Sequence, residues 1–183
     1  GTGKTRTAMT LIAQWLNNNN GPVVWLTYSK ELILQAANEF RKCWKHQGQY
    51  EADVRFYTGD ASTLTPESLD SFDICFTSFA KIGREASSGK STLKSLAQHT
   101  SLVVVDEAHQ ALAPSYKEAI DQFVFFQNNS ALLGLTATPG RTTSDQEESN
   151  IELSRLFGHS KVTLQIHGYE SPIDYLIQNG YLA

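Results

Sequence analysis

The chain of 183 residues is 40% hydrophobic and 19% charged, a composition typical of one globular domain and not of a disordered segment. Its formal net charge of −4 at pH 7 excludes a strongly basic protein that grips nucleic acid by charge alone, although phosphate contacts through hydroxyls and backbone amides are compatible with it. No apolar run approaches the roughly 18 residues that a membrane-spanning helix needs, so no membrane partner is expected.

Short apolar runs alternate with segments of helical period, a pattern typical of a parallel sheet covered by helices. In the first half of the chain we predict a glycine turn, then a helix with one apolar face from Ala8 to Leu16, strand Val23–Thr27, a helix over Ile33 to Trp44, strand Val54–Tyr57 and strand Phe72–Phe76. In the second half we predict helix Lys90–Gln98, strand Leu102–Val105, helix Pro114–Phe126, strand Ala131–Leu135, a mobile loop Gly140–Asn150, helix Ile151–Phe157, edge strand Lys161–Ile166 and helix Pro172–Tyr181.

The two cysteines, Cys43 and Cys75, are far apart and have no metal-ligand spacing. This usage favours reduced thiols in a cytoplasmic protein. The first residues contain no basic, apolar and small-residue leader, so nothing in them predicts secretion.

The chain begins Gly1-Thr2-Gly3-Lys4-Thr5, which matches the second half of the phosphate-loop pattern G-x-x-x-x-G-K-[ST]. Glycines let backbone amides turn toward phosphate oxygens, a lysine places its charge on the β- and γ-phosphates, and a threonine hydroxyl coordinates Mg²⁺. The helix that follows would point its positive end at the same anion. For these residues alone, a glycine turn without a ligand is the alternative.

Two carboxylates, Asp106 and Glu107, follow the apolar strand Leu102–Val105. A buried parallel strand places its last residues at the carboxyl edge of the sheet, where open α/β sheets bind ligands. One carboxylate can hold Mg²⁺, and the other can orient and deprotonate an attacking water. An acidic helix cap is the alternative for this segment alone. The order of phosphate loop and then paired carboxylates favours a Mg²⁺-ATP site.

Several segments resemble motifs of superfamily 2 DEAD/DEAH-type helicases. Asp106–His109 resembles motif II in its DEAH form, and Leu135–Arg141 resembles motif III in its T-A-T-P-x-R form, which is familiar from DNA-acting motors. Leu26–Gln35 is similar to motif Ia of the type III restriction subunit and RadD-like group, and Phe76–Phe79 lies where motif Ib is expected. Ser171–Leu182 resembles the segment that leaves the first motor lobe in that group. The resemblance covers essentially the whole chain, with the motifs in the order I, Ia, Ib, II, III.

The resemblance implies roles in nucleotide binding and hydrolysis. Gly1, Thr2, Gly3, Lys4 and Thr5 would bind the phosphates. Thr5 and Asp106 would hold Mg²⁺, and Glu107 would be the catalytic base.

It also implies residues that join the ATP site to nucleic acid. His109, Thr136 and Thr138 would link the nucleotide state to lobe movement, with His109 counted in the catalytic set. The residues expected to touch a nucleic-acid backbone are Ser29, Lys30, Thr77 and Ser78. The alternatives are turn roles for the threonines, a solvated first-turn role for Lys30, and a helix-cap role for Ser78.

The expected fold is therefore α/β: a RecA-like P-loop NTPase lobe, with a mainly parallel sheet and helices on both faces. We expect it to span residues 1–183 as the first motor lobe, truncated at its N-terminus, with the second motor lobe lying outside this chain. The expected function is ATP-driven movement along nucleic acid, DNA favoured over RNA, with ATP and Mg²⁺ as cofactors and with poor hydrolysis by the isolated fragment. A P-loop ATPase that remodels a different substrate and a non-catalytic nucleic-acid-binding fragment are the alternatives.

Overall fold

One parallel sheet organises the molecule in the computed structural model, which describes residues 3–59, 72–88, 91–124, 130–136, 147–162, 167–168 and 179. Within these residues five strands pair in the order β2-β3-β1-β4-β5, every pair parallel. The strands are β1 Val23–Thr27, β2 Val54–Tyr57, β3 Ile74–Ser78, β4 Leu102–Asp106 and β5 Ala131–Leu135. The predicted parallel α/β architecture is confirmed.

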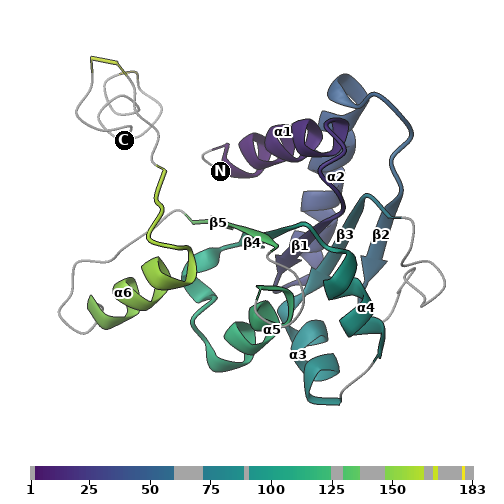
Figure 1. Cartoon of the computed structure of the whole chain (residues 1–183). Helices are drawn as coiled ribbons and strands as arrows, with labels where there is room; N and C mark the ends of the chain where they lie inside the picture. The colour runs from purple at the N-terminus through teal and green to yellow at the C-terminus, as the bar shows by residue number, and fades with distance from the viewer. Residues whose placement is uncertain are drawn as a thin grey trace.

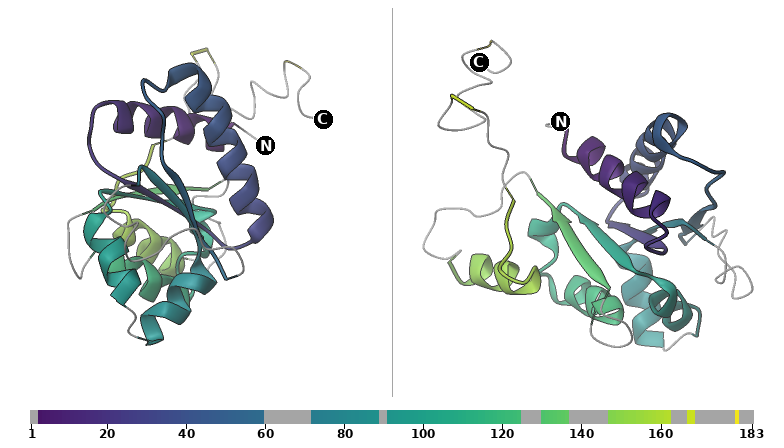
Figure 2. Two further views of the ribbon diagram at one scale, coloured as in Figure 1. Left: turned by 90° about the vertical axis from the view of Figure 1, so that its right-hand side faces the viewer. Right: turned by 45° about the horizontal axis from the view of Figure 1, so that its top comes forward.

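Helices cover both faces of this sheet. They are α1 Lys4–Asn17, α2 Lys30–Gln47, α3 Phe79–Ser88, α4 Ser91–His99, α5 Pro114–Val124 and α6 Glu147–Leu156, with a short 3-10 turn η2 at Ala108–Gln110. Helices α1 and α2 lie on one face, while α3, α4 and α5 lie on the other (Figures 1 and 2). Helix α6 lies beyond α5 at the β5 side of the sheet (Figure 1).

The alternating side chains of the central strands build a separate core layer against each set of helices. Val24 and Val103 belong to the cluster that packs on α3, α4 and α5, whereas Trp25 and Val104 belong to the cluster that packs on α1 and α2. All residues of β1 and β4 are buried. Burial on both faces is why these strands read as continuous apolar runs in the sequence.

Several predicted boundaries were wrong. Strand β3 spans Ile74–Ser78 instead of the predicted Phe72–Phe76, because Phe72 is a buried residue that precedes the ladder. Helix α3 was not predicted at all, since it follows β3 without a loop.

The elements predicted for the C-terminal part of the chain agree with the structure only in part. Helix α6 starts at Glu147, inside the predicted mobile loop, and Lys161 and Val162 are not in a strand. The rest of the predicted edge strand and nearly all of the predicted helix Pro172–Tyr181 lie outside the described residues.

Other features agree with an ordinary α/β core. In the described part of the chain, no helix combines the length and apolar character needed to cross a bilayer. Cys43 and Cys75 are free thiols. Burial in β3 raises the pKa of the Cys75 thiol, so this side chain behaves as an apolar core residue.

Candidate functional site

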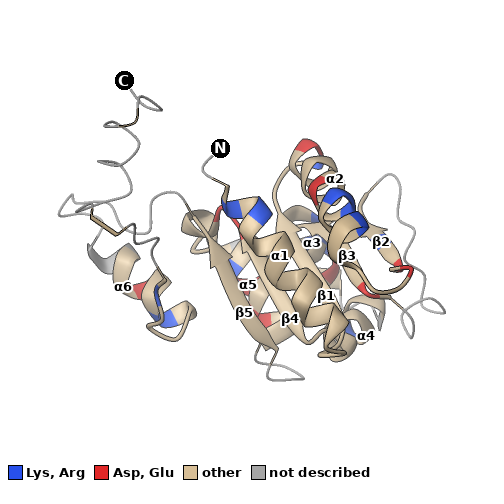
Figure 3. Ribbon diagram, turned by 90° about the horizontal axis from the view of Figure 1, so that it is seen from above, with Lys and Arg blue, Asp and Glu red and all other residues tan. Residues whose placement is uncertain are grey.

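The first helix begins at a glycine whose backbone conformation suits a phosphate-binding turn. Gly3 precedes α1 with φ 79°, in the left-handed region that glycine enters without steric cost. No described side chain caps this end, and the first amides of any α-helix have no partner within the helix. Lys4 and Arg6 add positive charge at the start of α1 (Figure 3). The helix end therefore offers amide donors and charge to an anion, while Gly1 and Thr2 lie outside the described residues.

The paired carboxylates lie at the carboxyl end of β4. Asp106 is the last residue of the strand and is only 9% exposed. Glu107 follows with φ 52° and ψ 52°, a left-handed conformation that costs a residue with a side chain about 1–3 kcal/mol. The turn lets the Glu107 amide donate to Asp106 Oδ1 at 3.1 Å. Strained backbone of this kind is typical of functional sites.

The electrostatics of Asp106 connect it to the start of α1. Burial raises the pKa of the Asp106 carboxyl; the Glu107 amide and the Lys4 ammonium lower this pKa, and the Glu107 charge raises it. The start of α1 therefore contributes positive charge to the surroundings of Asp106. A bound cation would favour the ionised carboxylate that burial disfavours.

Two of these residues offer oxygen atoms of the kind that Mg²⁺ takes as ligands. Asp106 offers hard carboxylate oxygens and Thr5 offers a hydroxyl at the start of α1. Within the described residues, no cluster of three or more His, Cys, Asp and Glu side chains could enclose a metal ion. Mg²⁺ usually takes one or two protein carboxylates and completes its shell with phosphate and water.

His109 joins the carboxylates to the end of β5. Its Nδ1 atom lies 3.2 Å from Thr136 Oγ1 and 3.4 Å from Glu107 Oε2. Strands β4 and β5 are parallel neighbours, so the residues after each of them emerge at the same edge. Glu107, His109 and Thr136 therefore form one cluster, and Thr138 lies outside the described residues.

Ser29 and Ser78 cap two helices at this same edge of the sheet. Ser29 Oγ accepts from the amide of Leu32 in α2 at 3.2 Å, and Ser78 Oγ accepts from the amide of Lys81 in α3 at 3.2 Å. The strands that precede them, β1 and β3, are paired in parallel, so the two caps are neighbours. The Ser29 hydroxyl also donates to the carboxyl of Glu31, a contact that helps to lower the pKa of Glu31. The backbone amides at the start of each helix give that end a partial positive charge. With the exposed Lys30 beside Ser29, the edge has donors and charge suited to phosphates.

Thr77 does not share this exposure. It is fully buried, and its Oγ1 donates to the Tyr57 carbonyl at 2.6 Å, joining β3 to the end of β2. The predicted contact between this side chain and nucleic acid does not fit that burial. The reason is its position inside the sheet: Thr77 pairs with Leu26 of β1 and Tyr57 of β2, whereas Ser78 is the last residue of β3.

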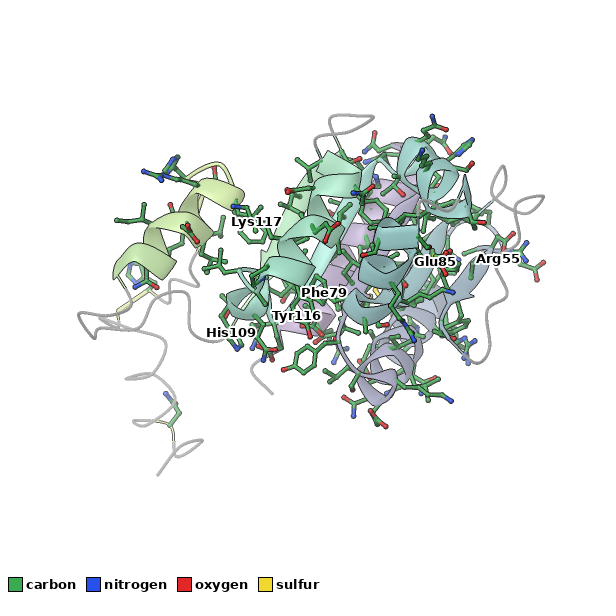
Figure 4. All side chains as sticks on the ribbon, turned by 90° about the horizontal axis from the view of Figure 1, so that it is seen from below. Arg55, Phe79, Glu85, His109, Tyr116 and Lys117 are labelled. Atoms are coloured by element: carbon green, nitrogen blue, oxygen red, sulfur yellow. The ribbon has the colours of Figure 1, made fainter. Side chains whose placement is uncertain are left out.

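The start of α3 is held by buried contacts that the sequence did not predict. Lys81 Nζ lies 2.9 Å from Glu85 Oε1, with side chains only 16% and 6% exposed, and 4.5 Å from the centre of the Tyr57 ring. Phe79 stacks on Tyr116 of α5 with ring centres 4.4 Å apart (Figure 4). These contacts fix the helix that Ser78 caps.

The structure also adds two unpredicted residues to the site. Gln110 Nε2 donates to the Tyr28 hydroxyl and lies 3.4 Å from Nε2 of His109. Gln110 directly follows the DEAH segment, and that position is a signal that sequence reasoning could have used. Tyr28 gave no signal, since one exposed tyrosine after a strand is common.

Comparison with known proteins gives a family and a set of relatives. The family model described as type III restriction enzyme, res subunit, matches residues 1–141. An ATP-dependent DNA helicase, MPH1 of Coccidioides immitis (strain RS), is 28% identical over 174 residues, and the match covers 92% of this chain. The chain spans 15% of the length of that relative.

Solved helicase structures share the fold. The helicase domain of Hef from Pyrococcus furiosus superposes with a TM-score of 0.65 at 27% identity, covering 86% of this chain and 32% of that one. The UvsW helicase from bacteriophage T4 superposes with a TM-score of 0.59 at 16% identity, covering 82% of this chain and 48% of that one. At that identity the likeness to UvsW concerns the fold alone.

Proposed function

Because the chain belongs to the family of type III restriction enzyme res subunits and forms the first RecA-like lobe of a superfamily 2 helicase-type motor, we propose that it binds and hydrolyses Mg²⁺-ATP to drive movement along DNA. The main support is the cluster of Glu107, His109 and Thr136 at the edge where Ser29 and Ser78 cap their helices. One sheet edge thus combines groups for ATP hydrolysis with groups for phosphate contact.

In this proposal the start of α1 binds the nucleotide phosphates through its amides and Lys4. Thr5 and Asp106 hold Mg²⁺, which supplies charge stabilisation to the phosphate oxygens. Glu107 orients the attacking water and accepts its proton. His109 keeps its ring against Glu107 and Thr136, so that the state of the base and the position of the segment after β5 depend on each other.

The proposed nucleic-acid edge consists of Ser29, Lys30 and Ser78. Hydroxyl donors at helix N-termini suit phosphate oxygens without reading the bases. DNA is favoured over RNA because the Leu135–Arg141 segment has the T-A-T-P-x-R form and because the relative MPH1 is named a DNA helicase. We further propose that residues 1–183 act as the first lobe beside a second motor lobe, whose groups complete the charge stabilisation of the transition state.

Turnover measurements on the protein that contains this chain test the proposal. We expect ATP hydrolysis to rise at least several-fold with DNA and less with RNA, and to be lost in a Lys4→Ala control. Equal turnover with and without nucleic acid would favour an ATPase that remodels another substrate. DNA binding without ATP binding would favour a non-catalytic binding module.

A further inference from the structure

We propose that Tyr28 and Gln110 are positioning residues that connect the nucleic-acid edge to His109 in the ATP site, an inference that rests on the proposed function. Tyr28 follows β1 and directly precedes Ser29, the cap of α2. Gln110 ends the 3-10 turn that follows Glu107. Their side chains meet although the residues are 82 positions apart.

The amide nitrogen of Gln110 has two partners. Nε2 donates to the Tyr28 hydroxyl and lies 3.4 Å from Nε2 of the His109 ring. A side-chain amide nitrogen has two hydrogens, so it can donate to both at once. In that arrangement the ring Nε2 is an acceptor, and the hydrogen of a neutral imidazole must be on Nδ1.

The other side of the ring leads independently to the same tautomer. Nδ1 of His109 lies 3.4 Å from Glu107 Oε2 and 3.2 Å from Thr136 Oγ1. An ionised carboxylate only accepts hydrogen bonds, so a nitrogen that faces it is favoured as an N–H donor. Gln110 therefore holds His109 in the orientation that directs an N–H toward Glu107, the role that outer contacts often have in tuning a functional histidine.

The contact between Tyr28 and Gln110 lies outside the hydrophobic core. Tyr28 is 36% exposed, and neither Tyr28 nor Gln110 belongs to the two core clusters. Docking of a phosphate at Ser29 and Lys30 would act on the backbone next to Tyr28, and the Gln110 amide transmits that displacement to the ring. Substitution of either residue can therefore remove the contact between Tyr28 and Gln110 without creating a cavity in the core.

Variants that remove only the polar atoms test the link in the protein that contains this chain. Tyr28→Phe and Gln110→Met should each lower the ratio of DNA-stimulated to basal ATP turnover about fivefold or more at saturating DNA. The double variant should be no worse than either single variant, because both cut the same link. Tyr50→Phe is the matched control: Tyr50 is 42% exposed, and its hydroxyl donates to Asp73 before β3, away from the site.

Two outcomes would contradict the proposed link between Tyr28, Gln110 and His109. Additive losses in the double variant would overturn it. The link would also be overturned if the variants only raised the DNA concentration needed for half-maximal stimulation and left the ratio at saturating DNA unchanged. That result would make Tyr28 a direct DNA contact.

The second readout does not depend on DNA. If the unmodified protein shows no stimulation by nucleic acid, the proposed function fails, yet the tautomer of His109 still tests the geometry. Imidazole nitrogen NMR in mildly alkaline buffer, assigned by the signal lost in His109→Asn, should show Nδ1–H in the unmodified chain and mixed tautomers in Gln110→Met. An Nε2–H ring in the unmodified chain would overturn the positioning role.

Discussion

The ring of His109 and the hydroxyl of Thr136 lie 3.2 Å apart, although 27 positions separate them in the chain. Parallel pairing of β4 and β5, with Asp106 opposite Leu135, brings the residues after both strands to one point. Glu107 lies against the same ring nitrogen. One side chain therefore touches both the proposed catalytic base and the segment proposed to couple hydrolysis to movement.

Removing the Thr136 hydroxyl should damage coupling more than chemistry. Thr136→Val loses the contact with His109 and leaves Glu107 in place, so movement along DNA should fall about tenfold more than ATP hydrolysis. Both rates are measured on the same preparation, and Thr136→Ser, which keeps the hydroxyl, is the control. Equal losses of both rates would indicate that the substitution damages the ATP site itself and does not act on the coupling between hydrolysis and movement.

The fold was largely predictable because the central strands β1 and β4 are buried on both faces and read as continuous apolar runs, while β2 and β5 are mostly half-buried. The runs at Val23–Thr27, Val54–Tyr57 and Ala131–Leu135 contain apolar or β-branched residues, and these strands have the predicted bounds. Helix α3 was missed because Ser78 ends a strand and caps a helix in one step, leaving no loop as a signal. The start of α6 was missed because Glu147 and Glu148 belong to a polar, aperiodic stretch.

The candidate site was predictable where roles follow from the chain order. Asp106 and Glu107 lie at the end of a buried strand, as expected of a strand followed by paired carboxylates. Sequence alone could not find Tyr28 beside Gln110, because that contact depends on the left-handed turn at Glu107 and the short 3-10 turn after it. The burial of Thr77 depends on its place inside the ladder between β1 and β2, and the predicted end of the strand at Phe76 hid this.

Glu107→Gln should separate nucleotide binding from turnover. The amide keeps the size of the side chain but cannot accept the proton, so turnover should fall about 10²–10⁴-fold while Mg²⁺-ATP affinity changes little. Titration calorimetry and steady-state hydrolysis measure the two quantities. Turnover within a factor of a few of the unmodified protein would remove Glu107 from the role of base.

Gly134 of β5 should not tolerate a side chain. A Cβ atom there would lie 2.6 Å from Phe157 Cζ and 2.9 Å from Ala108 Cβ, where the residue after α6 packs onto the turn beside the site. Gly134→Ala should lower the free energy of unfolding by about 1–3 kcal/mol, the usual range for overpacking. Denaturant unfolding measures this, and adding Phe157→Leu should restore part of the loss. An alanine variant of unchanged stability would mean that Phe157 moves away without cost.

Gly3 should matter through its backbone conformation and not through the space around it. Its φ of 79° is left-handed, and among the described residues no atom lies within 4 Å of the position that a Cβ would take. In Gly3→Ala, the left-handed turn before α1 should therefore be less favourable by about 1–2 kcal/mol. If ATP binding requires that turn, the affinity for Mg²⁺-ATP should fall by roughly 5- to 30-fold. Gly3→Asn should lose less, because asparagine enters the left-handed region more readily than alanine. Titration calorimetry of the three proteins gives the order, with thermal unfolding as the check that each is folded. Equal weakening by alanine and asparagine would mean that a ligand-filled space, and not φ, requires glycine here, and unchanged affinity in both would remove Gly3 from the phosphate site.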